Sequence, residues 1–306
     1  SHMESMDPFM IKTSTLNVQK ILCFLQKKKI VMEREEYRIF YVDTGVFSTL
    51  LFAVDKGFQK EKDRGSRKMI NLSVNVNKVA TLRNARGGDD PNVIEAARTC
   101  IEAGCQGITV HPREDQRHIR TTDVRELAPI LTVEFNIEGD PRPDLIDLVM
   151  EIRPDQFTLV PVEADEITSH HGWNIQKDQK VLRPVIEQCK AAGIRVSLFM
   201  DAIPETMADA SAIGADRVEL YTGPYASAKT DAEISNEFAR IQQSHDAARD
   251  AGMEINPGHD LNLNNLHRLQ KLQGIKEVSI GHALIGHALY VGLFQAVKDF
   301  RKACGQ

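Results

Sequence analysis

The sequence has few cysteines, and none of them is placed for a zinc site or a dithiol redox motif. The five cysteines among 306 residues form no C-x-x-C pair and have no histidine at zinc-finger spacing. We therefore expect free thiols in a reducing compartment. No apolar run reaches the ~18–20 residues of a membrane span, and the polar, acidic start is unlike a secretory signal. We expect a cytoplasmic protein without membrane contact.

The sequence also lacks the motifs of the common cofactors. It has no dinucleotide fingerprint, no phosphate-binding P-loop and no H-E-x-x-H metal motif, so we expect no cofactor and no required metal. Charge is uneven: residues 1–68 carry 13 Lys and Arg against 9 Asp and Glu, whereas the remainder carries 25 against 34. The acidic main part argues against a nucleic-acid partner.

The first 68 residues differ from the rest of the chain. Ser1-His2-Met3 resembles a cloning scar, and residues 4–68 show no helical or strand periodicity over a useful length. A strand pattern begins directly after Met69. We expect residues 69–306 to form the catalytic domain, with Met69 as the natural start and the preceding residues as a non-native or disordered extension. The alternative is a genuine N-terminal extension.

Eight short apolar runs follow, separated by stretches with helical character that several times end in glycine. The runs are rich in Val, Ile, Leu and Phe, as buried parallel strands must be. They are Ile70–Asn77, Gly107–His111, Thr132–Ile137, Gln156–Pro161, Arg195–Met200, Arg217–Tyr221, Glu254–Asn256 and Glu277–Gly281. Eight strand–helix units of this total length predict an α/β fold of the (β/α)8 type, a TIM barrel. A doubly wound open sheet is the alternative.

Polar residues gather where the predicted strands end, and in a parallel barrel those ends converge on one site. His111 and Arg113 follow the second strand, and Glu138 ends the third. Glu219 alternates with apolar neighbours within the sixth strand, so it is expected to point into the barrel, where it must be paired or functional. Histidine and buried carboxyls suit proton transfer, and arginine suits phosphate recognition.

Two Gly-His pairs, Gly258-His259 and Gly281-His282, follow strands seven and eight, where barrels commonly bind phosphate. Arg83 and Arg86 lie in a basic stretch after the first strand and are candidates to clamp an anion. The connection Glu163–Gln179 is longer than usual and is typical of a lid or binding loop.

An ordered set of motifs from Met69 to Ala303 resembles one family, the pyridoxine 5′-phosphate synthases of the deoxyxylulose-phosphate-dependent vitamin B6 pathway. The motifs are VNVNKVATLRNARGG, GITVHPREDQRHI, FNIEG, LVPVEADEITSHHGW, VSLFMD, ELYTGPYA, NPGHDLN and SIGHALIG. The resemblance implies a (β/α)8 barrel with extra helices at the interfaces of a homo-octamer. It implies condensation of 3-amino-2-oxopropyl phosphate with 1-deoxy-D-xylulose 5-phosphate to pyridoxine 5′-phosphate, phosphate and water by acid/base catalysis.

The resemblance also assigns roles to residues that match the motifs. His111 and Glu138 match proton acceptors, His259 matches the proton donor, and Glu219 matches an acid that stabilises the transition state. Residues expected to hold deoxyxylulose phosphate are Arg113, His118 and Thr168. Asp260 follows the proton-donor histidine, where many members have glycine, and its backbone N–H is expected still to contact substrate. Those expected to hold the amino-oxopropyl phosphate are Asn75, Arg86, Gly281 and His282.

The chain departs from the family at one point. Many members read Asn-x-Asp-His on the first strand, whereas this chain reads Asn75-Val76-Asn77-Lys78. Asn77 cannot accept a proton and Lys78 is a cation, so we expect both only to contact substrate. Two other classes remain as alternatives: a phosphosugar aldolase or epimerase, which a Schiff-base lysine in a strand would favour, and a non-catalytic barrel that binds or assembles.

Overall fold

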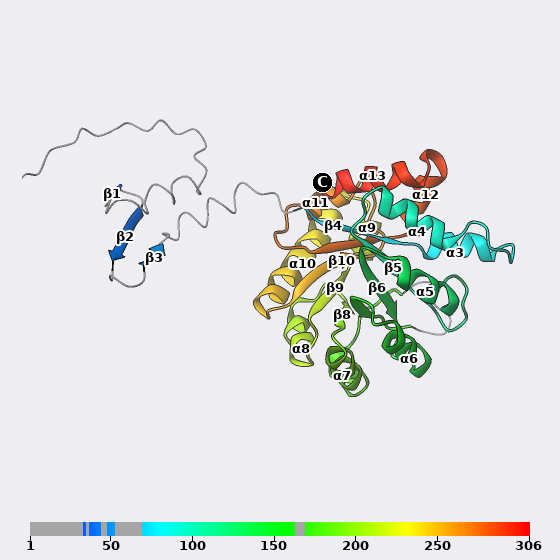
Figure 1. The fold of residues 1–306 in the computed structure, drawn as a ribbon, viewed down its shortest axis with the longest axis horizontal. Coiled ribbons are helices and arrows are strands. Elements are labelled where there is room, and N and C mark those ends of the chain that lie inside the picture. The colour runs from blue at the N-terminus through cyan, green and yellow to red at the C-terminus, as the bar shows by residue number, and fades with distance from the viewer. Residues whose placement is uncertain (1–32, 35–36, 44–47, 53–68, 163–168) are drawn as a thin grey trace, which may run out of the picture. The chain divides into compact units, whose positions relative to one another are not determined.

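The computed structural model describes residues 33–34, 37–43, 48–52, 69–162 and 169–306, in two compact units that divide after Ser66 (Figure 1). In the first unit, strands β1 (Glu33–Arg34), β2 (Tyr37–Asp43) and β3 (Ser48–Phe52) form an antiparallel sheet. The sequence pattern did not predict these strands. The proposed start at Met69 is not tested by this arrangement and stays a hypothesis.

The second unit is a closed barrel of eight parallel strands, and it confirms the predicted fold. The strands are β4 (Asn71–Asn75), β5 (Gly107–Val110), β6 (Glu134–Gly139), β7 (Gln156–Leu159), β8 (Arg195–Met200), β9 (Arg217–Tyr221), β10 (Glu254–Gly258) and β11 (Glu277–Ile280). Each overlaps a predicted run, with ends that differ by up to two residues. Strand β11 pairs with β4 in parallel register, Glu277 opposite Asn71, and this pairing closes the barrel.

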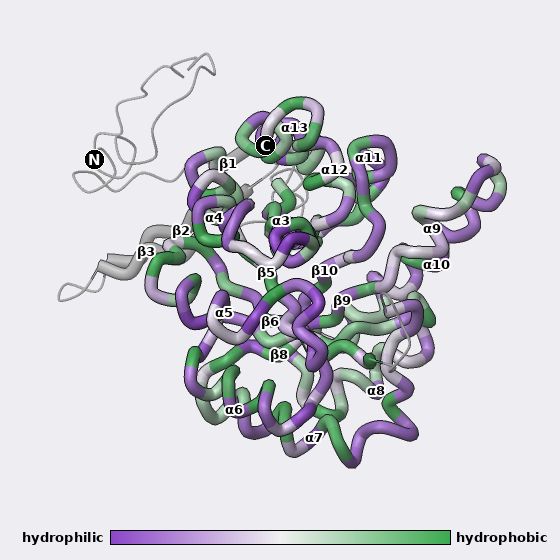
Figure 2. Tube along the Cα trace, turned by 90° about the vertical axis from the view of Figure 1, so that its right-hand side faces the viewer, coloured by the Kyte–Doolittle hydropathy of each residue, from purple (hydrophilic) through white to green (hydrophobic). Residues whose placement is uncertain are grey.

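Helices surround the barrel, including additional ones beyond the basic repeat. They are α3 (Asn77–Asn84), α4 (Val93–Glu102), α5 (Thr121–Leu127), α6 (Pro143–Ile152), α7 (Ile175–Ala191), α8 (Met207–Ala212), α9 (Gly223–Ser227), α10 (Asp231–Asp250), α11 (Leu266–Leu269), α12 (His282–Val291) and α13 (Leu293–Ala303). Hydrophobic and hydrophilic residues alternate along most helices (Figure 2), as expected where one face packs on the strands. None of the described helices is long and apolar enough to cross a membrane.

The hydrophobic core lies between the strands and the helices. Outward-facing strand residues such as Leu72, Ile108 and Val218 are fully buried against the helical layer. Cys100, Cys105, Cys189 and Cys304 are also buried there, and all four are free thiols. Cys23 lies outside the described residues. This apolar layer stabilises the barrel at roughly 25 cal/mol per Å² of buried apolar surface and leaves the inward-facing side chains available for other roles.

The inside of the barrel is polar instead. Ser73 and Thr109 share a hydrogen bond of 2.7 Å, and Thr158 donates to Asn136 at 2.9 Å. The first residues of six strands form a polar layer below them, here called the N-terminal ring: Glu134, Gln156, Arg195, Arg217, Glu254 and Glu277. Many barrels of this type fill this space with Val, Ile and Leu. A polar interior requires hydrogen-bond partners throughout, and it places charged groups directly beneath the C-terminal end of the barrel.

Candidate active site

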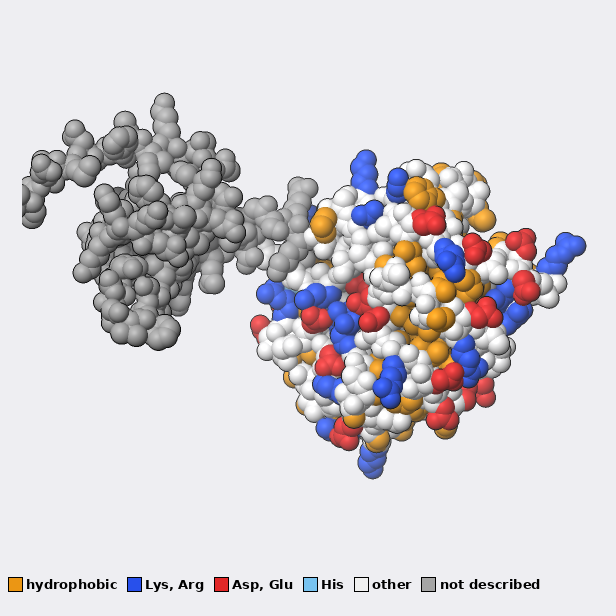
Figure 3. All heavy atoms as spheres, viewed as in Figure 1, with side chains coloured by type: hydrophobic (Ala, Val, Ile, Leu, Met, Phe, Trp, Pro, Cys, Tyr) orange, Lys and Arg blue, Asp and Glu red, His pale blue; other side chains and the backbone are white. Residues whose placement is uncertain are grey.

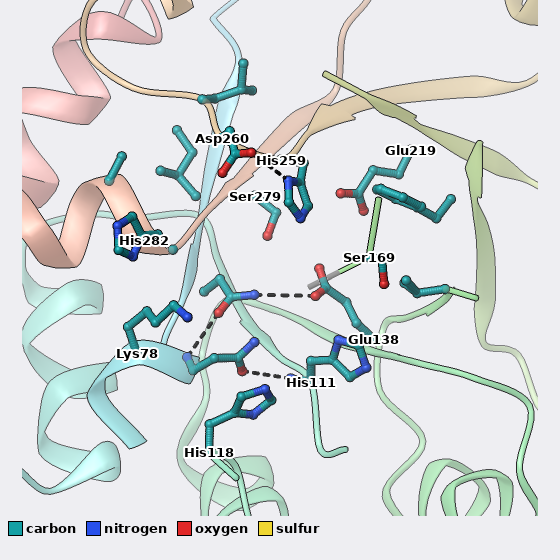
Figure 4. A pocket seen from close by; sticks show the side chains of 18 of the residues that line it. Lys78, His111, His118, Glu138, Ser169, Glu219, His259, Asp260, Ser279 and His282 are labelled. Atoms are coloured by element: carbon teal, nitrogen blue, oxygen red, sulfur yellow. Dashed lines mark hydrogen bonds and ion pairs between the residues drawn. The ribbon is translucent and has the colours of Figure 1, made fainter. Parts of the chain in front are cut away.

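A cavity of about 710 Å³ opens at the C-terminal ends of the strands (Figure 4). All four residues predicted to be catalytic line it, as do eight predicted to bind substrate. The twelve are His111, Glu138, Glu219, His259, Asn75, Asn77, Lys78, Arg113, His118, Asp260, Gly281 and His282. They come from six strand ends that are distant in the sequence. The prediction that these residues converge is therefore confirmed as geometry, while their individual roles remain proposals.

His111 follows β5 and is buried, with Nε2 lacking a hydrogen-bond partner among the described residues. Burial lowers the pKa of His111 well below its ordinary value, and the neighbouring His118 and Arg113 lower it further. His111 is therefore neutral at neutral pH, with one ring nitrogen able to accept a proton.

Glu138, near the end of β6, is buried at the centre of the cavity floor. Burial raises the pKa of Glu138 well above its ordinary value, and the nearby carboxyls of Glu219 and Glu277 raise it further. Asn75 Nδ2 donates to Glu138 Oε2 at 3.4 Å, and a hydrogen bond from Ser279 opposes the rise in pKa. The raised pKa favours the protonated form of Glu138, and an approaching cation would favour release of that proton.

Glu219 on β9 faces the same space, and its side chain points toward Glu138 and His259 (Figure 4). Burial raises the pKa of Glu219 to about 7, with His259 acting in the opposite direction. A Cβ atom at Gly258, on the adjacent strand β10, would lie only 2.0 Å from Glu219 Oε1. Glycine at this position therefore leaves the room that the Glu219 carboxyl occupies. The expectation that Glu219 points into the barrel is confirmed.

His259 is held in a strained stretch of backbone directly after β10. His259 and Asp260 have φ values of 85° and 56°, a region that non-glycine residues seldom adopt and that often marks functional sites. The Thr222 hydroxyl lies 2.6 Å from the carbonyl oxygen of Gly258 and 2.5 Å from that of His259, and it can donate to either. His259 Nδ1 is 3.1 Å from Asp260 Oδ2, a contact that orients the imidazole and lowers the pKa of Asp260.

The side of the cavity opposite Glu219 carries basic side chains, and Figure 4 shows Lys78, His118 and His282 there. Arg113 lines the same cavity and is buried. Burial lowers the pKa of His118 to about 4, and the charges of Lys78 and Arg113 contribute. His118 Nδ1 accepts a hydrogen bond from the backbone N–H of Ile119, so its proton resides on Nε2. This side can bind an anion through lysine, arginine and an imidazole N–H.

A second anion position lies at the start of α12. Gly281 precedes the helix, His282 begins it, and the first-turn backbone N–H groups of a helix attract negative charge. A Cβ atom at Gly281 would be 3.2 Å from Asn75, so glycine allows β11 and β4 to approach closely here. The site can therefore hold two anionic groups, one beside Arg113 and His118 and one at the start of α12.

The structure differs from two predictions about the binding loops, and a third falls on a residue that it does not describe. The clamp of Arg83 and Arg86 is wrong as predicted, because Arg83 is buried in a bidentate ion pair with Asp123 and Arg86 is exposed and does not line the cavity. The loop predicted to reach Gln179 ends earlier, since Asn174 caps helix α7 from Ile175. Thr168 lies outside the described residues.

Several residues that line the cavity were not predicted from the sequence, among them Ser169, Phe199, Asn262 and Ser279. Ser279 could have been predicted, because it alternates with Glu277 along β11 and with Gly281 directly after it, so the three residues share one face. Phe199 could have been found by the same alternation along β8, but its aromatic side chain suggested core packing. Among the described residues, no cluster of His, Cys, Asp and Glu could hold a metal ion.

Comparison with known proteins agrees with this architecture. The family described as "Pyridoxal phosphate biosynthesis protein PdxJ" matches residues 72–306. A pyridoxine 5′-phosphate synthase of Bacteroides thetaiotaomicron is 50% identical over 237 residues, which cover 76% of this chain and 98% of the relative. One of Xanthomonas oryzae pv. oryzae is 51% identical over 240 residues, covering 75% and 94%.

Among solved structures, phosphoribosylanthranilate isomerase of Thermotoga maritima has a TM-score of 0.50 at 15% identity, covering 78% of this chain and 99% of that one. This likeness supports the barrel fold alone. The family match over 72–306 and relatives that are half identical over nearly their whole length carry more weight. The chain belongs to the PdxJ family of pyridoxal phosphate biosynthesis proteins.

Proposed function

We propose that this protein is a pyridoxine 5′-phosphate synthase. It condenses 3-amino-2-oxopropyl phosphate with 1-deoxy-D-xylulose 5-phosphate and releases pyridoxine 5′-phosphate, phosphate and water. The observation that carries the proposal, beside the family, is one cavity that combines His111, Glu138, Glu219 and His259 with cationic groups at its edge. Ring formation requires imine formation, phosphate elimination, deprotonation and dehydration, and hence several positioned groups that transfer protons.

His111 serves as a proton acceptor. Its burial keeps the imidazole neutral, so a lone pair is available without prior deprotonation. The imidazolium that forms would lie beside Glu138 (Figure 4), and that carboxyl would stabilise it once ionised.

Glu138 and Glu219 exchange protons in the same space. The raised pKa of Glu138 favours its protonated form, and the positive charge of the substrate amine or of the iminium formed from it favours release of that proton. Glu138 can then accept a proton from the condensing substrates, in the role that the family assigns to it. Glu219, with its pKa raised to about 7, is poised between both forms at neutral pH and stabilises charge that develops beside it.

His259 serves as the proton donor that helps water to leave. Asp260 holds its Nδ1 side, so the opposite ring nitrogen faces the cavity. The rings of Phe199 and Tyr221 lie 6.1 and 5.2 Å from the imidazole between centroids and limit its movement. A fixed donor beside a carboxyl pair is suited to protonating a hydroxyl leaving group.

The two phosphates bind at different positions in the cavity. Arg113, His118 and Lys78 hold deoxyxylulose phosphate, as does Thr168, and Asn77 contributes beside them. The Asp260 backbone N–H is a further substrate contact. The amino-oxopropyl phosphate binds at Gly281 and His282, beside Asn75. Arg86 does not line the cavity formed by its own chain. Its proposed role as a phosphate ligand therefore requires that it reach the cavity of another subunit.

We further propose that the protein works as a homo-octamer in the cytoplasm. The end of α12 and the start of α13 expose Leu289, Tyr290, Val291 and Phe294 (Figure 3), and apolar residues grouped in this way favour a protein interface. Light scattering coupled to gel filtration measures the assembly directly. A monomer at micromolar concentration would contradict the octamer, and Tyr290→Glu should weaken any assembly that uses this surface.

The catalytic unit comprises residues 69–306. The family match begins at residue 72, and the barrel with its cavity lies wholly within this range. A chain that begins at Met69 should therefore keep the activity of the 306-residue protein. Loss of activity in a folded, shortened chain would show that the first 68 residues contribute to function.

The decisive experiment supplies both substrates to the purified protein and measures pyridoxine 5′-phosphate by mass spectrometry and phosphate by a coupled assay. The two products should appear in equal amounts. Omitting either substrate should abolish both, and His111→Ala serves as a control for contaminating enzymes. Folded protein that yields no pyridoxine 5′-phosphate would contradict the proposal.

A further inference from the structure

The junction between β4 and α3 leaves one backbone donor without its usual sheet partner. The parallel ladder continues to Val76, whose N–H donates to the Thr109 carbonyl at 3.1 Å. The next bond of the ladder would run from the His111 N–H to the Val76 carbonyl. That carbonyl is already taken by helix α3, since it accepts from Val79 at 3.0 Å and from Ala80 at 3.3 Å. Another acceptor must therefore serve His111.

The side chain of Asn77 supplies this acceptor. Its Oδ1 accepts the His111 backbone N–H at 2.9 Å, so a side-chain amide replaces the missing backbone carbonyl. Asn77 is itself fixed, because its own N–H donates to Asn75 Oδ1 at 3.0 Å. The other end of the Asn75 amide donates to Glu138 Oε2 at 3.4 Å. Two asparagines thus connect Glu138 to the backbone of His111.

The backbone bond matters because the His111 imidazole has little else to hold it. Its Nε2 has no hydrogen-bond partner among the described residues, and its ring stands edge-on to His118 with centroids 6.0 Å apart. The direction of the ring is then set by the backbone position and by packing. A displacement of the His111 backbone would be transmitted to the ring, and errors of about 1 Å can cost about 100-fold in rate.

We propose that Asn77 is a positioning residue that works by accepting the His111 backbone N–H, and that its contact with substrate is secondary. This inference rests on the proposed role of His111. The proposed role of Asn77 requires only an acceptor oxygen on a side chain of the length of Asn or Asp. Asp meets the requirement and Ala does not, although Asp lacks the amide donor that a direct substrate contact would use.

The test compares Asn77→Ala with Asn77→Asp. We expect Asn77→Ala to lower kcat by about 30-fold, with KM for each substrate changed less than threefold, because a buried donor loses its partner and His111 shifts. Asn77→Asp should restore kcat to within about threefold of the original protein. Hydrogen–deuterium exchange in a peptide that contains His111 should be faster in Asn77→Ala and unchanged in Asn77→Asp.

Asn92→Ala provides the matched control. Asn92 caps α4, where its side-chain oxygen accepts from the N–H groups of Ile94 and Glu95 at 2.9 and 3.0 Å, outside the cavity. Its loss removes the same kind of bond and should lower Tm by about 2–4 °C, while kcat and exchange at His111 stay unchanged. Equal losses of kcat in Asn77→Ala and Asn92→Ala would show that the loss of kcat comes from general destabilisation, and this would overturn the proposal.

Two further results would overturn it. A raised KM with unchanged kcat in both Asn77 variants would make Asn77 a substrate contact, and unchanged exchange at His111 in Asn77→Ala would show that the bond holds nothing in place. The exchange measurement needs no turnover. If the original protein makes no pyridoxine 5′-phosphate, the proposed function fails, and the exchange result still decides whether Asn77 positions the His111 backbone.

Discussion

The carboxyls at the two ends of the barrel interior have opposite surroundings and opposite shifts in pKa. In the N-terminal ring, Glu134 accepts hydrogen bonds from Arg195 and Arg217, and Arg217 also donates to Glu254 at 2.7 Å. Burial alone would raise the pKa of Glu254, but hydrogen bonds from Lys276 and Arg217 bring it below its ordinary value. At the C-terminal end, Glu138 and Glu219 face each other and their pKa values rise.

The comparison shows that pairing with arginine decides whether a carboxyl in this barrel serves structure or proton transfer. Carboxylates paired with arginine stay ionised and hold neighbouring strands together. Carboxyls that lack such a partner keep protons near neutral pH, which makes them suited to proton transfer. Glu277 lies between the two regimes: it belongs to the ring, yet burial and the nearby Glu134 raise its pKa to about 8, although Arg217 and Arg195 oppose this.

The largest expected effect is loss of turnover when an imidazole is removed from the C-terminal end. His111→Ala and His259→Ala should each lower kcat by about 10³-fold, in the range typical of general acid/base groups, while the far-ultraviolet circular dichroism stays unchanged. Steady-state product formation measures this effect. Near-normal rates in either variant would refute the role assigned to that histidine.

A matched pair of glutamate substitutions on β6 tests the comparison itself. Glu138→Gln should lower kcat by about 100-fold with little loss of stability, because glutamine resembles the protonated acid that the site already holds. Glu134→Gln, at the other end of the same strand, should lower Tm by about 2–6 °C and leave kcat within about threefold, because Arg195 and Arg217 lose a charged partner. The reverse pattern would show that the two ends are not divided in this way.

Binding should depend on the cationic side of the cavity. Lys78→Met should raise KM for deoxyxylulose phosphate by about tenfold, because one charge that attracts phosphate is lost. Arg125→Met is the control, since it removes a cation from an exposed ion pair with Glu151 away from the cavity, where such pairs contribute little. An unchanged KM in Lys78→Met would remove Lys78 from the phosphate site.

The smallest effect is a change in the pH dependence of stability. Folded Glu277 keeps its proton up to about pH 8, whereas the unfolded residue ionises near its ordinary value of 4.5. The folded state therefore binds more protons in this window, so the contribution of Glu277 to stability falls as pH rises from about 4.5 to 8. Glu277→Gln removes this ionisation. The change in Tm that the substitution causes should therefore be about 3 °C more positive at pH 8.5 than at pH 5.

Glu254→Gln sharpens that measurement. The folded pKa of Glu254 lies below its ordinary value, so its contribution to stability is present above that value and is lost as pH falls through the folded pKa. Glu254→Gln should therefore lower Tm at pH 8.5, the opposite sign to Glu277→Gln. The same sign in both variants would show that the surroundings of these two acids do not differ as described.

Much of the fold could be predicted because strand runs and strand ends are local properties of the sequence. The eight runs were found from Val, Ile and Leu, and residues such as His111 and Glu138 were found because they end strands. The exact end of β4 was missed: the run was read through Asn77, whereas the Val76 carbonyl bonds into helix α3. Nothing local in the sequence shows which of two competing donors a carbonyl will accept.

The arginine clamp failed for a non-local reason. Arg83 pairs with Asp123, 40 residues away, and periodicity along the chain cannot reveal such a partner. Arg86 lies just beyond α3, and its position in the sequence gives no direction for its side chain. Sequence position thus predicted which residues lie near the barrel rim, and tertiary contacts decided which of them face the cavity.

The glycine at position 258 has a consequence for how this site can be silenced. A single methyl group there would occupy the place of Glu219 Oε1, and the carboxyl would have to turn away from Glu138 and His259. Gly258→Ala would thus leave every acid, base and cation in the sequence and still dismantle their arrangement. The vulnerable part of this pocket is the space beside Gly258 that holds the Glu219 carboxyl, and a list of the functional groups in a related sequence would not show its loss.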